Sequence, residues 1–347
     1  MRVVELSGSA RDRGRAHGEE LRTDIADGME RWRGALARDV GDPNVYLERF
    51  LADTDHPSAI ERDTPELMDE VRGIAEGAAI PFVDCLAYQL MDEEWRYRTD
   101  VAMNRCSGIG VFGEESGATL LAQNMDLPSH YDGSQVLLRI DDRDTAALVF
   151  SAAGMLALDG CNDRGIGICC NTLAQLRTST DGLPVAFVVR AVLACTTHDD
   201  ALRLVRGVKH ASGQNYLVGG PERVVSLECS ADSVREYSPH STRVLHTNHP
   251  LVNDDLVAAP GREIATLAET ERRFEFLAAD VLDDAPLDAG GIKALLADRT
   301  TPICKVPTPD KPTITLGCLV MELAGEPVLH LAPGPPSETA FQDFRFD

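Results

Sequence analysis

An abrupt change of residue pattern near residue 106 constrains the fold of this chain more than any other feature. Residues 10–100 keep apolar positions near helical spacing, and TPELMDEVRGIAEGAAI opens with a Thr-Pro pair and acidic residues, as helices often do. After residue 106 the apolar runs are short, as in IGVFG and VLLRI, and Gly, Asp, Asn and Ser separate them. The pattern predicts a helical first part followed by consecutive strands.

The remaining sequence alternates between the two patterns. We expect helices at AFVVRAVLAC, TTHDDALRLVRGV, ETERRFEFLAADVL and AGGIKALLADR. We expect strands at residues 3–6, at NYLVGG, RVVSLEC, SVREYS and TRVLHTN, and a closing hairpin from TITLGCLVMEL and PVLHLAPG. The run GIGICC is apolar on both faces, which indicates a strand between two layers. The chain is therefore expected to be an α+β protein with layered sheets.

The charge balance excludes several classes of partner. The formal net charge is −23, so a nucleic acid or an anionic membrane would be repelled. The sequence has no apolar run of about 18 residues that could span a membrane, and its first residues do not resemble a signal peptide. A cytoplasmic location is the resulting expectation. The sequence does not decide whether the chain forms a homo-oligomer.

Nine cysteines raise the question of disulfides, metals or catalysis. The number is odd and no CxxC pair occurs, so neither a disulfide framework nor a zinc knuckle is indicated. Eight of the cysteines lie in apolar contexts typical of buried thiols. The absence of GxGxxG and GxxxxGK[ST] gives no case for a nucleotide site, and we expect neither a metal nor an organic cofactor.

Cys106 is the exception, because NRCSGIGVFG places it where the helical part hands over to the first strand of the second part. LLAQNMDLP then puts Asp126 near the end of the next strand. Two antiparallel neighbours joined by a hairpin can bring Cys106 and Asp126 side by side. A thiol beside a carboxylate and amides is a plausible nucleophilic site, although a structural thiol has the same pattern.

Several segments in the same order resemble the penicillin acyltransferase family, which includes isopenicillin N acyltransferase and is distantly related to bile salt hydrolases. The resemblance begins with the glycines of LSGSARDRGRAHGEEL and passes through Cys106-Ser107 and QNMD. It continues through SAAGMLALDGCNDRGIGICCNTL, NYLVGG, LHTNHPL and LAPGPP, and so covers nearly the whole chain. These families are N-terminal nucleophile hydrolases, so the resemblance implies a four-layer αββα sandwich.

The resemblance also implies a mechanism. The chain would cut itself between Arg105 and Cys106, and the free α-amine of Cys106, with a reference pKa near 7.7–8.0, would take the thiol proton. The thiol would attack a small N-acyl amide and form a thioester, which water or an amine would resolve. Residues 1–105 would remain docked as a helical small subunit, and 106–347 would carry the site.

The resemblance assigns roles to further residues. Asp126 matches the carboxylate that orients the amine, Asn248 matches an oxyanion donor, and Asn171 aligns with a second polar group of the oxyanion site. Arg273 fits the arginine of the family better than its competitor Arg299. Two further polar residues, on the strand of Asp126, are expected to face the substrate: Gln123 and Asn124. The chain departs from its relatives at Gln123, where bile salt hydrolases carry arginine, and at Arg105, where penicillin acyltransferases commonly carry glycine.

Two alternatives remain open at this point. One is an uncleaved Cys-His amidase with His246 or His249 as the base, and the other is a binding protein that keeps the fold without catalysis. The motif HTNH invites a metal interpretation, but residues three apart on a strand point to opposite faces. We therefore expect no metal at His246 and His249.

Overall fold

The computed structural model describes residues 1–98, 106–112, 118–257, 263–301 and 303–346. Its helices are α1 (Ala10–Glu20), α2 (Arg22–Val40), α3 (Pro43–Asp53), α4 (His56–Asp63), α5 (Pro65–Ala78), α6 (Phe82–Gln89), α7 (Met91–Tyr97), α8 (Val185–Leu193), α9 (His198–Gly207), α10 (Glu263–Val281) and α11 (Ala289–Leu296), with a 3₁₀ turn, η2 (Ser129–Tyr131).

The strands form two sheets. They are β1 (Arg2–Leu6), β2 (Ser107–Val111), β3 (Leu120–Pro128), β4 (Gln135–Asp142), β5 (Thr145–Ala152), β6 (Asp159–Asn162), β7 (Gly167–Thr172), β8 (Gln214–Gly219), β9 (Val224–Cys229), β10 (Val234–Tyr237), β11 (Arg243–His246), β12 (Thr313–Glu322), β13 (Val328–Ala332) and β14 (Gln342–Arg345). The eight-stranded sheet runs β1-β4-β5-β6-β7-β8-β9-β10, and the six-stranded sheet runs β11-β2-β3-β12-β13-β14.

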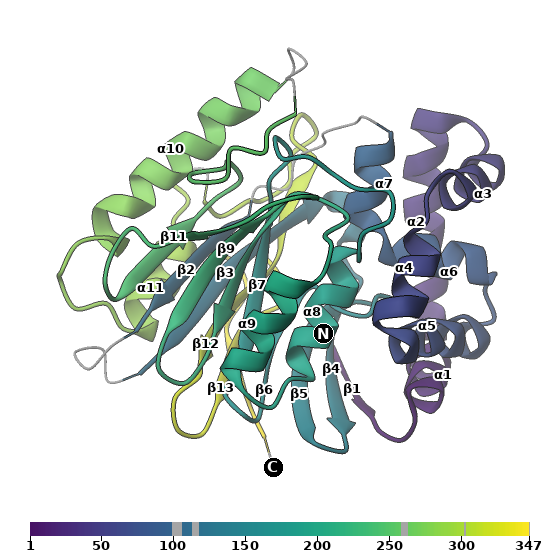
Figure 1. The fold of residues 1–347 in the computed structure, drawn as a ribbon, viewed down its shortest axis with the longest axis horizontal. Coiled ribbons are helices and arrows are strands. Elements are labelled where there is room, and N and C mark those ends of the chain that lie inside the picture. The colour runs from purple at the N-terminus through teal and green to yellow at the C-terminus, as the bar shows by residue number, and fades with distance from the viewer. Residues whose placement is uncertain (99–105, 113–117, 258–262, 302, 347) are drawn as a thin grey trace.

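The two sheets lie face to face and each carries helices on its outer side (Figure 1). Strands β2 and β3 pack on β7 and β8, whereas α8 and α9 cover the outer face of the eight-stranded sheet. Helices α10 and α11 pack on the six-stranded sheet. The predicted four-layer αββα sandwich is confirmed. Among the strands of the described ranges, neighbours pair antiparallel except β1 and β4, which are parallel.

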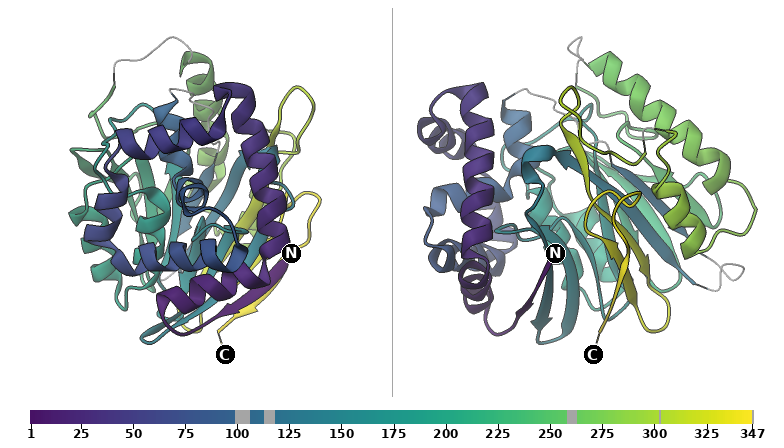
Figure 2. Two further views of the ribbon diagram at one scale, coloured as in Figure 1. Left: turned by 90° about the vertical axis from the view of Figure 1, so that its right-hand side faces the viewer. Right: turned by 180° about the vertical axis from the view of Figure 1, so that it is seen from behind.

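The first seven helices lie on the side of the molecule that also holds α8 and α9 (Figures 1 and 2). Helices α1 and α5 approach each other until their backbones touch. A Cβ on Gly14 would lie 1.9 Å from the carbonyl oxygen of Glu70, and one on Gly77 would lie 2.1 Å from that of Arg15. Only glycine permits this approach.

The structure bears out most of the expected elements. The helical first part, the consecutive strands after residue 106 and the closing hairpin of β12 and β13 are all present. Strand β14 was not expected. All nine cysteines are free, and eight are buried whereas Cys195 is half-buried. No helix in the described ranges is both long enough and apolar enough to cross a membrane.

Candidate active site

Cys106 lies directly before β2, and its side chain is only 1% exposed. The β2–β3 hairpin pairs Ser107 with Asn124, which places Cys106 beside Met125 and Asp126 of β3, as the sequence predicted. The thiol contacts the thioether sulfur of Met125 at 3.7 Å. The hairpin therefore positions the thiol and the carboxylate-bearing strand together.

The surroundings of Cys106 determine the protonation of its thiol. Burial raises the pKa of Cys106 well above its usual value, and the Asp126 carboxylate raises it further. The backbone N–H of Asp126 and the charge of Arg273 act in the opposite direction with smaller effect. The thiol in this environment is protonated near neutral pH, so it needs a nearby base before it can act as a nucleophile.

Arg273 of α10 joins Cys106 to a second part of the site. Its guanidinium is 1% exposed and donates from Nη1 to the carbonyl oxygen of Cys106 at 2.7 Å and to Ser107 Oγ at 3.0 Å. From Nη2 it donates to Asn248 Oδ1 at 2.9 Å. Arg299, the competing arginine, lies at the surface and pairs with Glu338 at 2.9 Å. The structure thus places Arg273, and not Arg299, beside Cys106.

Asp126 is fully buried, and its carboxylate is held from the neighbouring strand. Thr315 of β12, its partner in the ladder, donates its hydroxyl to Asp126 Oδ1 at 2.6 Å. The backbone N–H of Lys305 donates to the same hydroxyl at 2.8 Å, which orients it toward the carboxylate. This relay fixes the position of Asp126 without neutralising its charge.

Asn248 and Asn171 are two buried amides near Cys106. Asn248 Nδ2 donates one hydrogen to the carbonyl oxygen of Thr172 at 3.1 Å, and an amide nitrogen carries a second hydrogen. Asn171 Oδ1 accepts from Asn215 at 3.2 Å, whereas Asn171 Nδ2 has no partner in the described part of the chain. A Cβ added to Gly108 would lie 3.2 Å from Asn171 Oδ1, so this amide faces the strand that follows Cys106.

Gln123 and Asn124 point away from each other, as neighbours on a strand must. The Gln123 amide is fully buried and exchanges two hydrogen bonds with the backbone N–H and carbonyl of Cys170 on β7, which ties the two sheets together. Asn124 donates to the carbonyl oxygens of Leu296 at 2.8 Å and Ile303 at 3.2 Å, on the α11 side. The structure does not bring either residue to the lining of the cavity beside Cys106.

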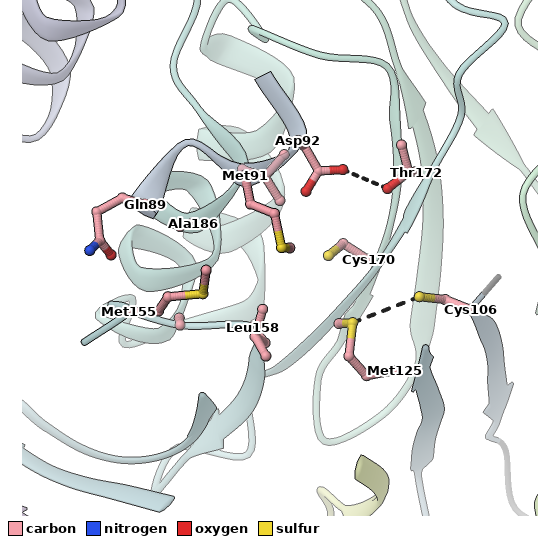
Figure 3. Close-up of a pocket in the computed structure, with 12 residues that line it drawn as sticks. Gln89, Met91, Asp92, Cys106, Met125, Met155, Leu158, Cys170, Thr172 and Ala186 are labelled. Carbon is pink, nitrogen blue, oxygen red and sulfur yellow. Dashed lines mark hydrogen bonds between the residues drawn. The ribbon is translucent and has the colours of Figure 1, made fainter. Parts of the chain in front are cut away.

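A small cavity of about 20 Å³ adjoins the thiol, enough for about one water molecule (Figure 3). Three methionines, Met91, Met125 and Met155, provide much of its wall. The further lining residues are Gln89, Asp92, Cys106, Ala157, Leu158, Cys170, Thr172, Val185 and Ala186. The wall is mostly apolar, with Asp92 as its acidic member.

Asp92 and Thr172 are the site residues that the sequence interpretation missed. Thr172 donates its hydroxyl to Asp92 Oδ1 at 2.6 Å, and its carbonyl accepts from Asn248. The available signal was the acidic run DEE in the apolar segment FVDCLAYQLMDEEW. Asp92, Glu93 and Glu94 are at most 6% exposed, although acidic residues are rarely buried.

The two histidines of HTNH are both buried but have other partners. His246 Nε2 meets Glu228 Oε1 at 2.8 Å and its Nδ1 meets the carbonyl oxygen of Thr247 at 2.8 Å. His249 lies against Thr247 and Thr270, and burial lowers its pKa to about 4. Within the described residues, no group of three His, Cys, Asp or Glu side chains could hold a metal ion.

Comparison with known proteins places the chain in a family. The family described as Acyl-coenzyme A:6-aminopenicillanic acid acyl-transferase matches residues 113–325, which is more than half of the chain. The chain belongs to this family. Its members are acyl-group enzymes of the penicillin acyltransferase type, so the sequence resemblance is confirmed.

Individual relatives of this acyltransferase-family chain are distant. The 40 kDa form of acyl-coenzyme A:6-aminopenicillanic-acid-acyltransferase from Emericella nidulans is 23% identical over 253 residues, which cover 72% of this chain and 70% of that protein. A variant of conjugated bile acid hydrolase from Clostridium perfringens aligns with a TM-score of 0.44 and 12% identity, over 69% of this chain and 97% of its own. Penicillin V acylase from Agrobacterium tumefaciens aligns with a TM-score of 0.39 and 13% identity, over 66% of this chain and 82% of its own.

One expected site residue, Arg105, lies outside the described residues. Of the remaining expected residues, some lie around Cys106 and others have their side chains bonded elsewhere. Cys106, Arg273 and Asn248 are connected by hydrogen bonds, and Asp126 lies beside Cys106. Asn171 faces the strand after Cys106, whereas the side chains of Gln123 and Asn124 are engaged elsewhere.

Proposed function

We propose that this chain cleaves a small N-acyl amide through a thioester on Cys106, after cutting itself between Arg105 and Cys106. The new N-terminal cysteine passes its acyl group to water, as a hydrolase, or to an amine, as an acyltransferase. Membership of an acyltransferase family supports the reaction class. The relatives named above act on penicillin-type and bile acid conjugates according to their names, and such amides are the first substrates to try.

The observation that carries the proposal is the Arg273 guanidinium, which holds the Cys106 carbonyl oxygen and the Asn248 amide at once. A buried arginine needs acceptors for its hydrogens, and here the backbone carbonyl of the thiol residue and the Asn248 side chain provide two of them. This arrangement fixes the backbone of the thiol residue and the orientation of a neighbouring amide. Such fixed geometry is what nucleophilic catalysis requires.

The chemistry follows from the surroundings of Cys106. In the uncut chain the nitrogen of Cys106 is an amide and is not basic, so it cannot take the proton of the thiol, whose pKa is raised, for attack on a substrate. Cleavage converts that nitrogen to an amine, which accepts the thiol proton while Asp126 stabilises the resulting ammonium. The thiolate then attacks the substrate carbonyl, and the ammonium returns the proton to the departing amine.

Donors near the thiol would stabilise the oxyanion that forms in this attack. Asn248 Nδ2 has a second hydrogen besides the one given to Thr172, and Asn171 Nδ2 is a buried donor without a partner in the described ranges. An unpaired buried donor is costly, which is a reason to look for its function. Water or an amine then attacks the thioester and releases the acyl group from Cys106.

The contacts of the N-terminal part support its retention as a small subunit after cleavage. Strand β1 completes an edge of the eight-stranded sheet, and Glu70 of α5 pairs with Arg190 of α8 at 3.1 Å, with both side chains buried. Gln89 donates to the carbonyl of Gly154 at 2.7 Å and accepts from the N–H of Leu156 at 2.7 Å. Separating the fragments would leave these buried groups unpaired.

The alternative of an uncleaved Cys-His enzyme has less support. Both ring nitrogens of His246 are already in contact with other groups, Glu228 and the Thr247 carbonyl. His249 has a pKa lowered to about 4 by burial, and a group with that pKa is a weak base for a thiol. Neither histidine lines the cavity that Cys106 adjoins.

Mass spectrometry of the purified protein tests the proposal directly. We expect two polypeptides, one that ends at Arg105 and one that begins Cys-Ser-Gly-Ile, which run together in native size-exclusion chromatography and separate in denaturant. The Cys106→Ala variant is expected to remain one intact chain, because it lacks the thiol that attacks the preceding peptide bond.

An intact wild-type chain would contradict the cleavage step. In that case His246→Ala separates the two alternatives: loss of amide hydrolysis supports a Cys-His enzyme, and absence of hydrolysis in the wild type supports a binding protein. Trapping of an acyl group on Cys106 by mass spectrometry, in the presence of a penicillin-type amide, tests the thioester separately from the cleavage.

A further inference from the structure

Asp92 offers the cavity beside Cys106 a carboxylate oxygen. The side chain is 6% exposed, and its hydrogen bonds with the described residues, from Thr172 at 2.6 Å and Gln214 at 3.1 Å, both go to Oδ1. Figure 3 shows the other carboxylate oxygen directed into the cavity, on the side away from Thr172. The Asp92 carboxylate therefore has an acceptor turned toward whatever occupies this space.

The next residue, Glu93, is also a buried acid, and one of its carboxyl oxygens has no hydrogen-bond partner among the described residues. Glu93 is 4% exposed, and its Oε1 accepts from Ser212 at 2.9 Å and from the N–H of Val185 at 3.3 Å. Glu93 Oε2 has no partner among the described residues. Burial, followed by the charge of Asp92, raises the pKa of Glu93 to about 8, so Glu93 holds a proton at pH 7. Burial also raises the pKa of Asp92, but the hydrogen bonds from Thr172 and Gln214 and the charge of Arg96 favour its charged form, so Asp92 is the member of the pair that carries the charge.

The position of this charge relative to the thiol is defined by a short series of contacts. Asp92 bonds to the Thr172 hydroxyl, the Thr172 carbonyl bonds to Asn248, and Asn248 bonds to Arg273, which holds Cys106. The remaining cavity wall between the acid and the thiol is mainly apolar. A ligand that fills the space would therefore contact the thiol of Cys106 in one part of the cavity and the carboxylate of Asp92 in another, with apolar side chains between them.

The cavity suits the acyl part of a substrate better than its amine. Once the thioester has formed, the acyl group is bonded to the sulfur of Cys106, which itself lines the cavity, whereas the amine has to leave. In this structure the space holds only about one water molecule, so its wall has to move before a short acyl chain can enter. The three methionines of the wall have flexible side chains, which can move to admit a short chain.

We propose that the cavity is the acyl-binding site and that Asp92 selects acyl groups with a primary ammonium a few bonds from the carbonyl. The proposal rests on the proposed function of Cys106 and adds the chemical class of its substrate: amides of short amino acids. A buried carboxylate in an apolar wall binds an ammonium through a charge-assisted hydrogen bond, and it penalises a neutral alkyl end, which leaves the charge unpaired.

The test compares matched 4-nitroanilides on the processed enzyme. The ammonium series is glycyl, β-alanyl and 4-aminobutanoyl, and the neutral series of equal length is propanoyl, butanoyl and pentanoyl. The expected result is that kcat/KM of the best ammonium substrate exceeds that of its neutral match by about 10²-fold. In Asp92→Asn this ratio falls to about 1 or below, because the amide keeps the shape but not the charge.

Two further variants guard the interpretation. Asp159→Asn is the matched control, since Asp159 is a fully buried aspartate near Cys106 that does not line the cavity, and its ratio is expected to stay high. Asp92→Glu keeps the charge on a longer side chain, so the preferred ammonium substrate becomes one methylene shorter. This shift decides the question if Asp92→Asn fails to fold or to process.

The outcomes separate the two proposals. A wild type that cleaves neutral amides through Cys106 with no preference for ammonium, or an Asp92→Asn variant that retains the preference, overturns the inference and leaves the proposed function standing. A wild type that cleaves neither series and forms no acyl adduct on Cys106, with penicillin-type amides included, overturns the proposed function and the inference together.

Discussion

The guanidinium of Arg273 reaches acceptors that the chain supplies from two distant segments, and this distinguishes it from the many surface arginines of the protein. Nη1 donates a hydrogen bond to the Cys106 carbonyl oxygen and Nη2 donates one to Asn248 Oδ1, so the planar group bridges the two residues. A lysine ammonium is a compact charge on a flexible stem and cannot span two such acceptors in fixed geometry. The shape of the side chain matters here as much as its charge.

We therefore expect Arg273→Lys to reduce kcat/KM of the processed enzyme by about 10²-fold, comparable with the loss of an oxyanion donor. The reason is that either the Cys106 carbonyl or the Asn248 amide loses its partner. Steady-state kinetics on the best amide substrate gives the measurement. Arg299→Lys is the control, because that side chain is 56% exposed, and it should change kcat/KM by less than about twofold. Equal kinetics for the two variants would remove Arg273 from the site.

At the residue scale, some residues of the candidate site could be predicted from the sequence and others could not. Cys106 and Asp126 could be placed together from a strand-turn-strand pattern, and the family resemblance indicated Arg273. Asp92 could not be found in this way, because an acid in a helical segment has the same pattern whether it faces water or a cavity. Gln123 was expected near the substrate, but strand alternation alone does not show that its amide would be used up by the Cys170 backbone.

At the scale of elements, the contact of α1 with α5 is the closest packing between helices in the first part of the chain. Gly14 and Gly77 each face a backbone carbonyl of the other helix at a distance where no Cβ fits. Because glycine has no side chain, the two helices can cross with their backbones in van der Waals contact. The arrangement fixes α5, which carries the buried Glu70, relative to the rest of the N-terminal part.

Gly14→Ala is expected to lower the free energy of unfolding by about 1–3 kcal/mol or more, because the methyl group forces the helices apart. Gly34→Ala is the matched control in α2: nothing lies within 4 Å of its added Cβ, and alanine there should stabilise the helix by about 0.5–1 kcal/mol. Urea denaturation of the uncut Cys106→Ala background measures both. A stabilising Gly14→Ala would show that the helices are not held at contact.

Elements with a strong pattern were predictable and those defined by partners were not. The apolar run that became β7 was expected between layers, and all but its last residue are buried. Strand β14 escaped because Gln342–Arg345 is polar and forms a strand only by pairing with β13 at the sheet edge. Its backbone hydrogen bonds are made with β13, and no pattern within its own four residues predicts that pairing.

At the scale of the whole molecule, the fold buries both basic and acidic groups, and burial shifts their pKa values in opposite directions. His17 accepts from the N–H of Gly154 at 3.0 Å, and burial lowers its pKa to about 4. Glu93 is shifted the other way, to about 8. Between pH 4.5 and 6 the unfolded chain binds a proton at His17 that the folded chain does not, whereas the folded chain keeps a proton at Glu93 that the unfolded chain loses. The two groups therefore have opposite effects on how stability changes with pH.

His17→Gln in the uncut Cys106→Ala background should decrease the slope of unfolding free energy against pH by about 1 kcal/mol per pH unit between pH 4.5 and 6. The sign follows because a lowered histidine pKa contributes stability that rises with pH. Glu93→Gln should increase the slope by a similar amount, because a raised carboxyl pKa contributes stability that falls with pH. Urea titrations at four pH values measure both, and slopes that move in the same direction would contradict the assignment.

The succession of helical and strand segments could be predicted from the sequence, because long stretches of helical or strand period define it. The four-layer order was implied by the family resemblance. The charge states of buried groups could not, since they depend on neighbours from other layers. Thr172 and Gln214 beside Asp92, and Thr315 beside Asp126, come from strands that the sequence does not connect to these acids. The three-dimensional structure is therefore needed to identify the hydrogen-bond partners of these buried acids.

The Arg273 contact has a practical consequence for engineering. The guanidinium holds the carbonyl of Cys106 and the hydroxyl of Ser107, which are both on the carboxyl side of the proposed cut. These contacts do not depend on which residue precedes Cys106. A junction that no longer cuts itself, but carries a recognition sequence for a foreign protease directly before Cys106, would therefore turn the proposed enzyme into a switch that an added protease turns on at a chosen time.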